Sequence, residues 1–248
     1  MKLEIHSISD KGKRTNNEDM VLVGTDIFRD DLRNYEINIT ENQKPYLIAV
    51  ADGMGGHNAG EYASELVLQN ISASIGNLPG HLNTDELKNH LEQNIKKIHS
   101  ILLTEGENDL SKKGMGSTFC AIIFYFDNIY SINIGDSRLY RYRDGILVQL
   151  TRDHSLREFT GDKNIPKNII VNSFGGGEKI FFDFECITKK VLPDDILLLC
   201  TDGLTDGLND MLLEQIIEKN NKVPSLIQYS IENGSVDNIS CIYIKILP

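Results

Sequence analysis

Five short acidic motifs are the features of this sequence that could do chemistry. Most of them follow an apolar, β-prone run. The acidic residues concerned are Glu18, Asp19, Asp52, Asp136, Asp202 and Asp237. A buried strand rarely ends in a carboxylate without a partner, because an uncompensated charge near a core is costly. Carboxylates at one rim of a sheet would repel one another unless cations lay between them. Hard divalent ions such as Mg²⁺ and Mn²⁺ prefer such all-oxygen sites, so the pattern predicts a metal site assembled from strand ends.

A phosphate group is the substrate that such a site would suit. Two divalent ions about 3.5–4 Å apart can hold a shared water, lower its pKa and clamp the oxygens of a phosphoryl group. A phosphate also calls for a planar cation that donates two hydrogen bonds at once. Arg14 lies four residues before Glu18 and could supply that cation.

Hydrophobic periodicity predicts the elements that position these residues. Residues 3–9 alternate as a strand, and residues 46–51 form a buried strand that runs into Asp52. Apolar residues at helical spacing predict one helix through Ala63 and Ile75 and a second through 87–102, with Thr84 as its N-cap. Strands and short helices follow. They are strands at 118–126, 129–134, 138–143, 146–150, 196–200 and 239–246, and helices after Asn209 and at 225–232.

Two of the strand pairs are expected to be hairpins. Their turns are Asp127-Asn128 and Asp144-Gly145, and the second is a strong hairpin signal between alternating strands. Helices followed by strands and then by helices indicate an α+β fold. Two antiparallel sheets packed face to face with helices outside would fit, although composition alone does not select this architecture. We expect one domain over residues 1–248.

Composition limits the classes of function. The formal net charge of -11 argues against non-specific binding to nucleic acid or anionic lipid. The chain has 4 Cys without the spacing of a zinc site, and we expect reduced, buried thiols. The N-terminus lacks the apolar stretch of a signal peptide, and no apolar run is long enough to span a bilayer. We therefore expect a cytoplasmic protein.

Taken together, the motifs resemble the ordered motifs of the metal-dependent PP2C-type (PPM) serine/threonine phosphatases in their compact bacterial form. Each motif alone is weakly specific, but the full set in order is highly specific. The resemblance covers the chain from about residue 8 to the C-terminus. The matching segments are GKRTNNED (12–19), VADGMGGHNAGE (50–61), GST (116–118), NIGDSR (133–138), LTRDHS (150–155), CTDGLTD (200–206) and DNIS (237–240).

The resemblance implies a four-layer α-β-β-α sandwich with a dinuclear Mn²⁺ or Mg²⁺ centre at one rim of the sheets. It implies hydrolysis of phosphoserine and phosphothreonine in proteins by a metal-activated water, without a phosphoenzyme. By the same resemblance, Asp52 bridges both ions and the backbone carbonyl of Gly53 is a ligand. Asp202 and Asp237 would bind one of the two ions.

The remaining roles come from the same motif matches. Asp19, with Glu18, would support the other ion through water. Asp136 would bind a third, weaker ion that it shares with Asp202. Arg14 would bind the substrate phosphate.

The sequence departs from the family pattern in two places. Some relatives have a proposed general acid, His, directly after the Asp-Gly pair, whereas this chain has Met54 there and His57 later in a Gly-rich turn. The identity of the proton donor to the leaving alkoxide is therefore left open, and a metal-bound water could serve. Residues 155–177 correspond to the flap beside the site. This flap is shorter than usual, so substrate contacts cannot be carried over to it.

Other polar residues have structural explanations of equal or greater weight. Asp206 could lie near the third ion or could start the next helix. We expect Arg138 to pair with a carboxylate and His154 to make structural hydrogen bonds. We interpret Ser117 as part of a tightly packed turn rather than a nucleophile, and His99 as an ordinary helix residue.

Two competing functions make different demands on the sequence. A thiol phosphatase needs Arg six residues after its Cys, and the four positions are Phe126, Leu192, Asp206 and Leu247. A D-x-D-x-T nucleophile motif is also missing, so a covalent mechanism is excluded. A catalytically weak PP2C-like sensor or binding module remains the alternative, although such a chain should have lost ligands. We expect phosphorylated proteins as substrates, a Ser/Thr kinase as a possible partner, no nucleic acid, no membrane, and a monomer.

Overall fold

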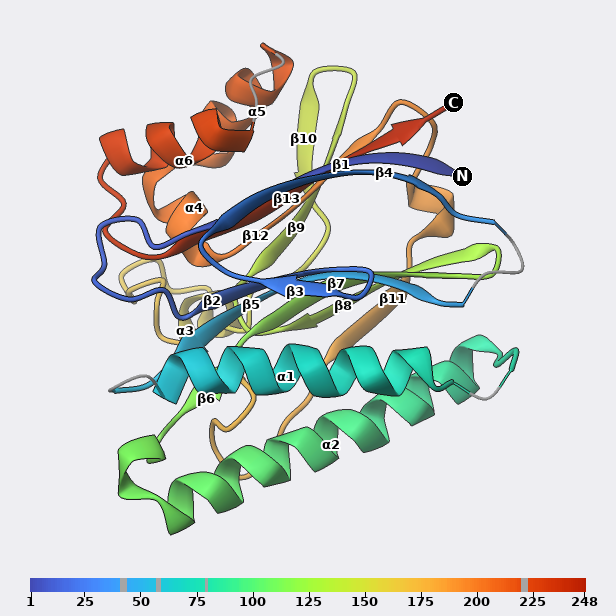
Figure 1. Cartoon of the computed structure of the whole chain (residues 1–248). Helices are drawn as coiled ribbons and strands as arrows, with labels where there is room; N and C mark the ends of the chain where they lie inside the picture. Colours follow the sequence, from blue (N-terminus) through green and yellow to red (C-terminus); the bar gives the residue numbers. More distant parts are fainter. Residues whose placement is uncertain (41–43, 57–58, 79, 220–222) are drawn as a thin grey trace.

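Two antiparallel β-sheets lie face to face in the computed structural model, with helices on both outer sides (Figure 1). The structure describes residues 1–40, 44–56, 59–78, 80–219 and 223–248. His57, which the sequence placed in the Gly-rich turn, lies outside these residues. The four layers are those that the resemblance implied.

The first sheet contains the N-terminal strand beside the C-terminal one. In spatial order its strands are β10 (Ile146–Gln149), β9 (Arg138–Arg143), β12 (Ile196–Cys200), β13 (Ile239–Leu247), β1 (Lys2–Asp10) and β4 (Asp31–Asn38). β1 and β13 pair over nine residues, from Lys2 opposite Leu247 to Asp10 opposite Ile239. The last strand in the sequence is therefore an interior strand of this sheet.

The second sheet contributes the strand that carries Asp52. In spatial order its strands are β11 (Asp183–Cys186), β8 (Asn128–Ile134), β7 (Phe119–Tyr125), β5 (Tyr46–Met54), β2 (Asp19–Val23) and β3 (Asp26–Phe28), and the short β6 (Gly116–Ser117) pairs with β5. β5 is buried from Leu47 to Ala51. This explains why it reads as a continuous apolar run rather than as an alternation.

The core between the sheets consists of β-branched and other aliphatic side chains from both inner faces. Ile5 and Ile242 come from the first sheet, and Val21, Val50 and Ile122 come from the second. All five are fully buried. The area removed from water here stabilises the packing of the two sheets and makes their shared rim a fixed platform.

Two long helices, α1 (Ala59–Gly76) and α2 (Thr84–Asn108), cover the outer face of the second sheet (Figure 1). The apolar residues that predicted them are buried there, with Leu66 partly buried. The predicted cap was wrong by one residue. Asn83 is the N-cap of α2 and forms a capping box with Glu86, whereas Thr84 is the first helical residue and hydrogen-bonds to Tyr130.

The C-terminal helices cover the outer face of the first sheet. They are α4 (Asp202–Gly207), α5 (Asp210–Glu218) and α6 (Val223–Glu232). Asn209 caps α5 as predicted, by accepting from the amide of Leu212. Shorter helical segments are η1 (Leu110–Lys112), α3 (Leu156–Thr160) and η2 (Thr188–Lys190).

Three other details differ from the sequence-based expectation. β8 already begins at Asn128, so the first hairpin turns at Phe126 and Asp127. Cys186 is exposed, whereas the other three thiols are buried as expected, and all four are free. The strands between residues 19 and 38 were not predicted, and neither were β6 and β11. No helix in the described part of the chain has the length and apolar character needed to cross a bilayer.

Candidate metal centre

Acidic residues in or next to five different strands gather at one rim of the sandwich. Asp19 in β2 lies directly opposite Asp52 in β5. Asp136 follows β8, Asp202 follows β12, and Asp237 lies two residues before β13. Burial raises the pKa of Asp52 well above its usual value, and the charges of the other four add to the rise. These five residues, with Glu18, are called the carboxylate rim below.

Buried hydroxyl groups hold the backbone of Asp52 in place. Its amide donates to Oγ1 of Thr118 at 3.0 Å, and its carbonyl accepts from the Thr118 amide at 2.9 Å. Thr118 Oγ1 also lies 2.8 Å from Oγ of Ser137, the residue after Asp136. Thr118 thus connects the backbone of Asp52 to the residue that follows Asp136.

A second hydroxyl connects Asp19 to the position before Asp202. Thr201 Oγ1 donates to Oδ2 of Asp19 at 2.8 Å and accepts from the Ser240 amide at 3.0 Å. Thr201 therefore joins the two sheets at the rim. Asp19 is 1% exposed, and this hydrogen bond satisfies only one of its two oxygens.

Gly53 and Gly203 are required by close backbone approaches. A Cβ atom on Gly53 would overlap the carbonyl oxygen of Gly60 and lie 2.6 Å from that of Glu18. A Cβ atom on Gly203 would overlap the carbonyl oxygen of Asn238. The glycine of each Asp-Gly pair therefore allows two chain segments to meet at the rim. A simple turn would not require such a close approach.

Asn238 attaches the N-terminal loop to the rim. Its side chain accepts from the Glu18 amide at 2.9 Å and donates to the carbonyls of Lys11 and Asn16 at 2.9 and 2.8 Å. This clamp positions Arg14, whose guanidinium donates to Oδ2 of Asp237 at 2.8 Å. The Arg14 side chain is 56% exposed, so it remains available to a ligand from solvent.

Glu18 lies beside the first turn of α1 rather than in the middle of the rim. Its carbonyl accepts from the Gly53 amide at 3.1 Å and from Ser64 Oγ at 2.6 Å. A Cβ on Gly60 would lie 2.6–2.8 Å from its carboxylate atoms. Burial raises the pKa of Glu18, while the charge of Arg14 acts against the rise. This position fits an indirect contribution to a metal centre, through water.

The rim has the properties of a cation site. Oδ1 of Asp19 and Oδ1 of Asp136 are buried and have no hydrogen-bond partner. A buried carboxylate oxygen without a donor is costly, and a cation would remove that cost. Among the described residues, no three His, Cys, Asp or Glu side chains converge closely enough to form a ligand set on their own. A set completed by the Gly53 carbonyl and by waters fits Mg²⁺ or Mn²⁺, which retain water ligands.

Two carboxylates of the rim share a small cavity with a third carboxylate outside it. Asp136, Asp202 and Asp206, called the outer cluster below, line one small cavity. Asp206 lies within α4, and the next helix begins at Asp210 after its cap Asn209. The alternative that Asp206 starts the next helix is therefore wrong, and its position fits the neighbourhood of a third ion.

Arg138 and His154 are structural, as predicted. Arg138 forms a bidentate pair with Asp153, with Nε–Oδ1 and Nη2–Oδ2 distances of 2.9 and 2.6 Å. His154 is buried, and its Nδ1 lies 3.2 Å from the Gly135 amide and 2.7 Å from the Asn172 side-chain amide. These contacts connect the base of the flap to the turn that carries Asp136.

Sequence comparison decides the family. The family model described as protein phosphatase 2C matches residues 24–225. The serine/threonine phosphatase stp of Listeria innocua is 31% identical over 222 residues, which cover 84% of this chain and 87% of the relative. The chain belongs to the protein phosphatase 2C family. Arg14, Glu18, Asp19 and Asp237 lie outside the segment matched by the model, so their assignment depends on the geometry given above.

Solved structures of protein phosphatase 2C enzymes have the same fold. A serine/threonine phosphatase of S. agalactiae superposes with a TM-score of 0.80 at 27% identity, over 98% of this chain and 99% of that chain. A PstP catalytic domain in complex with two manganese ions superposes with a TM-score of 0.75 at 27% identity, over the full length of both chains. The two-sheet architecture is therefore that of the family.

Sequence reasoning missed the hydroxyl groups that connect the carboxylates of this protein phosphatase 2C. Thr201 and Ser137 each lie directly beside a predicted ligand, within the motifs 200–206 and 133–138. Both are buried. A small hydroxyl residue next to an acidic strand end was the available signal. The role of this hydroxyl group became clear only in the structure, where Thr201 lies beside Asp19.

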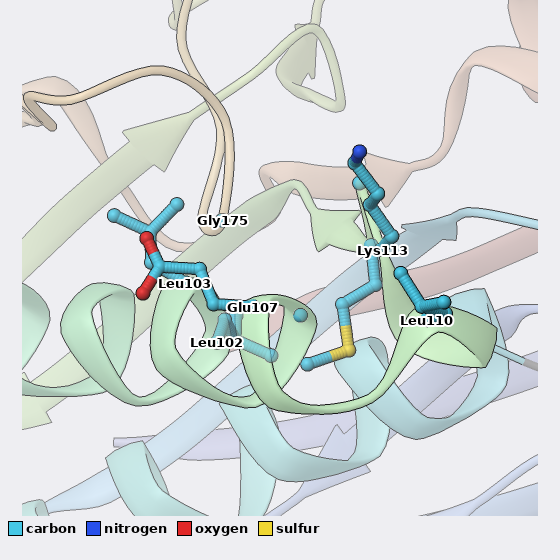
Figure 2. Close-up of a pocket in the computed structure, with 9 residues that line it drawn as sticks. Leu102, Leu103, Glu107, Leu110, Lys113 and Gly175 are labelled. Carbon is cyan, nitrogen blue, oxygen red and sulfur yellow. The ribbon is translucent and has the colours of Figure 1, made fainter.

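A larger groove lies away from this centre. Figure 2 shows it between the C-terminal half of α2, the segment around Lys113 and the flap residue Gly175. Its volume is about 350 Å³. No described residue of the carboxylate rim lines it. His99 is buried beside it in α2 and accepts from the Gly175 amide at 3.1 Å. His99 is therefore a contact to the flap, which is more than the ordinary helix residue that was expected.

We expect the metal-free protein to lose stability as pH rises. Burial raises the pKa of Asp19 and Asp136 to about 8 and that of Asp202 to about 6, from 3.8. Between about pH 4 and 8 the folded state therefore binds more protons than the unfolded state, so the free energy of unfolding falls as pH rises. Thermal unfolding in chelator at pH 5 and pH 8 measures this. Mn²⁺ should restore stability at pH 8.

The Asp19→Asn variant is the control, because its amide cannot ionise. Its melting temperature in chelator should depend less on pH than that of the unmodified protein. A melting temperature that rises from pH 5 to pH 8 in chelator would contradict the raised pKa values.

Proposed function

We propose that this protein hydrolyses phosphoserine and phosphothreonine in proteins, using a dinuclear Mn²⁺ or Mg²⁺ centre at the carboxylate rim. The observation that carries the proposal is the convergence of buried carboxylates with unpaired oxygens next to an exposed arginine. Membership of the protein phosphatase 2C family supports it. So does the relative PstP, whose catalytic domain was solved in complex with two manganese ions.

The proposed ligand set uses the strand ends of both sheets. Asp52 would bridge the two ions, with the Gly53 carbonyl on one side and Asp202 and Asp237 on the other. Asp19, with Glu18, would support the other ion through water, and Asp136 would bind a third, weaker ion that it shares with Asp202. When bound, the ions would lower the pKa of a water molecule, and their positive charge would stabilise the phosphoryl oxygens.

The residues of the chain would orient the substrate and its leaving group. Arg14 would grip two phosphate oxygens with its planar fork, and Asp237 holds the guanidinium at the rim by the 2.8 Å bond. Met54 cannot donate a proton, so the alkoxide that leaves must take its proton from another group. The flap, residues 155–177, lies next to the outer cluster and would border the bound phosphopeptide.

Activity measured against metal content tests the proposal. Purified protein should hydrolyse p-nitrophenyl phosphate and a phosphothreonine peptide with Mn²⁺ or Mg²⁺, and chelator should stop both reactions. Binding of the phosphopeptide without turnover at any metal concentration would favour the sensor or binding module. Activity that is unchanged by chelator would contradict a metal mechanism.

Arg14→Ala should mainly raise KM. The change removes the bidentate contact to the phosphate and the bond to Asp237, while every carboxylate of the rim remains in place. Arg14→Lys should restore only part of the loss, because a point charge replaces a planar fork. Steady-state kinetics and inhibition by inorganic phosphate measure this. Unchanged phosphate binding by the Ala variant would show that the assigned role is wrong.

Asp136→Ala should behave differently from changes at the dinuclear ligands. The variant should still bind two ions but turn over phosphopeptide poorly, because only the outer cluster loses an oxygen ligand. Calorimetric titration with Mn²⁺ beside kinetics checks both parts. Loss of all metal binding would place Asp136 in the dinuclear core. Unchanged turnover would make it a structural carboxylate.

We further propose a cytoplasmic monomer that acts on the targets of a Ser/Thr kinase. The four free thiols fit a reducing compartment. The net charge of -11 fits a protein that does not bind nucleic acid. Light scattering in solution tests the monomer. Dephosphorylation of the kinase or its targets in a reconstituted mixture tests the partner.

A further inference from the structure

The outer cluster faces a cavity that the flap closes. Asp136, Asp202 and Asp206 form one wall, and Lys167 and Asn168 of the flap form part of the other. The cavity volume is about 20 Å³, which is enough for a single water molecule or ion. The flap and the outer cluster therefore share a space that one cation can fill.

The charges around this cavity do not balance without the flap. Asp136 is only 5% exposed, and its Oδ1 is buried without a hydrogen-bond partner. Arg138 also lines the cavity, but its guanidinium is held by both oxygens of Asp153. Among the described residues of the cavity wall, Lys167 is the cation that remains to face Asp206 and its neighbours.

The charge of Lys167 acts on the cluster from a distance. Burial raises the pKa of Asp206, and the Lys167 ammonium opposes that rise. Lys167 is exposed. Ser155 pairs with Ile170 within the flap, and Phe174 attaches the flap to the body of the protein through two backbone hydrogen bonds with Ser117 of β6. The ammonium can therefore approach or leave the cavity without unfolding the flap base.

We propose that Lys167 is a tethered counter-ion of the outer cluster that competes there with a divalent ion and holds the flap over the site. Two cations in a space for one repel each other, so flap closure and occupancy by an outer ion oppose one another. By linkage, each weakens the other by the same factor. Lys167 is thus a positioning residue, and the proposal rests on the proposed function only for the presence of divalent ions at the rim.

Metal titration of Lys167→Met tests the competition. Met keeps the length of the stem and removes the charge. Calorimetry with Mn²⁺ should show an outer site that binds about five- to tenfold more tightly, the size expected for one charge acting on a divalent ion across a partly wet cavity. The two inner sites should be unchanged. Lys163→Met, an exposed lysine on the same flap that does not line the cavity, is the matched control and should match the unmodified protein.

Proteolysis tests the flap. Phe159 is 50% exposed in α3 of the flap, and chymotrypsin should cut there faster in Lys167→Met than in the unmodified protein when chelator is present. In Asp206→Asn, one of the three carboxylates that attract the Lys167 ammonium has lost its charge. Adding Lys167→Met to that variant should therefore change cleavage less than it does alone.

Three results would overturn the proposal. An unchanged outer-site affinity together with weaker inhibition by inorganic phosphate would make Lys167 a substrate-binding group. A weaker outer site in Lys167→Met would make it a support for the ion rather than a competitor. If Lys163→Met changed the outer-site affinity as much as Lys167→Met does, the change would be due to general surface charge. Neither titration nor cleavage requires turnover, so a protein that fails to hydrolyse phosphopeptides still gives a separate answer.

Discussion

Asp202→Ala and Asp237→Ala should each abolish phosphatase activity while leaving the fold largely intact. Each change removes an oxygen that is proposed to bind a metal ion at the rim. Losing the charge stabilisation of one ion costs several kcal/mol, which corresponds to a fall in kcat of about a thousandfold or more. Neither side chain belongs to the core between the sheets, so the melting temperature in chelator should change little at pH 5, below the raised pKa of Asp202. Kinetics at saturating Mn²⁺ measures the loss.

Asp127→Ala is the matched control, because this turn residue joins β7 and β8 at the end of β8 opposite Asp136. It should keep full activity. Turnover near that of the unmodified protein in either Asp202→Ala or Asp237→Ala would contradict the site assignment. If both variants unfold, Asp202→Asn and Asp237→Asn separate loss of the charge from loss of the fold.

Gly53→Ala should lose both metal binding and stability. The added methyl group would overlap the carbonyl oxygen of Gly60 and press on that of Glu18. The first turn of α1 or the end of β5 must then move, which costs about 1–3 kcal/mol. The same movement displaces the Gly53 carbonyl from its proposed place as a ligand. Circular dichroism during heating and calorimetry with Mn²⁺ measure the two losses.

Gly56→Ala separates this crowding from a general effect on the loop. A Cβ at Gly56 would meet nothing within 4 Å, so this variant should bind metal and unfold like the unmodified protein. Tight Mn²⁺ binding by Gly53→Ala would show that the close approach can relax without cost. The Gly53 carbonyl would then not be a fixed ligand.

Local patterns were sufficient to predict the elements with strong periodicity. The stripe from Leu87 to Leu102 gave α2, and the apolar run 46–51 gave β5, because each buries one continuous surface. The Asp144-Gly145 turn predicted its hairpin for the same local reason. The strands between residues 19 and 38 were missed. β4 is mostly exposed at the sheet edge, so its sequence carries little apolar signal.

The site itself could be predicted as a set of residues but not as a geometry. The acidic strand ends were visible in the sequence, and their order identified the family. That Asp19 lies opposite Asp52 follows from the register of β2 on β5, which depends on tertiary packing. The clamp formed by Asn238 spans more than two hundred residues, from the position just before β13 to Lys11. No local pattern can reveal such a contact.

The position of β13 sets the moment at which the enzyme can first work. This strand lies between β12 and β1 in the interior of the first sheet (Figure 1), and it follows directly after Asp237 and Asn238 in the chain. During synthesis, the earlier strands leave the ribosome with a gap where β13 belongs and with the Arg14 loop unattached. We therefore expect a chain that lacks β13 to have no phosphatase activity, because both the sheet and the Arg14 loop would be incomplete.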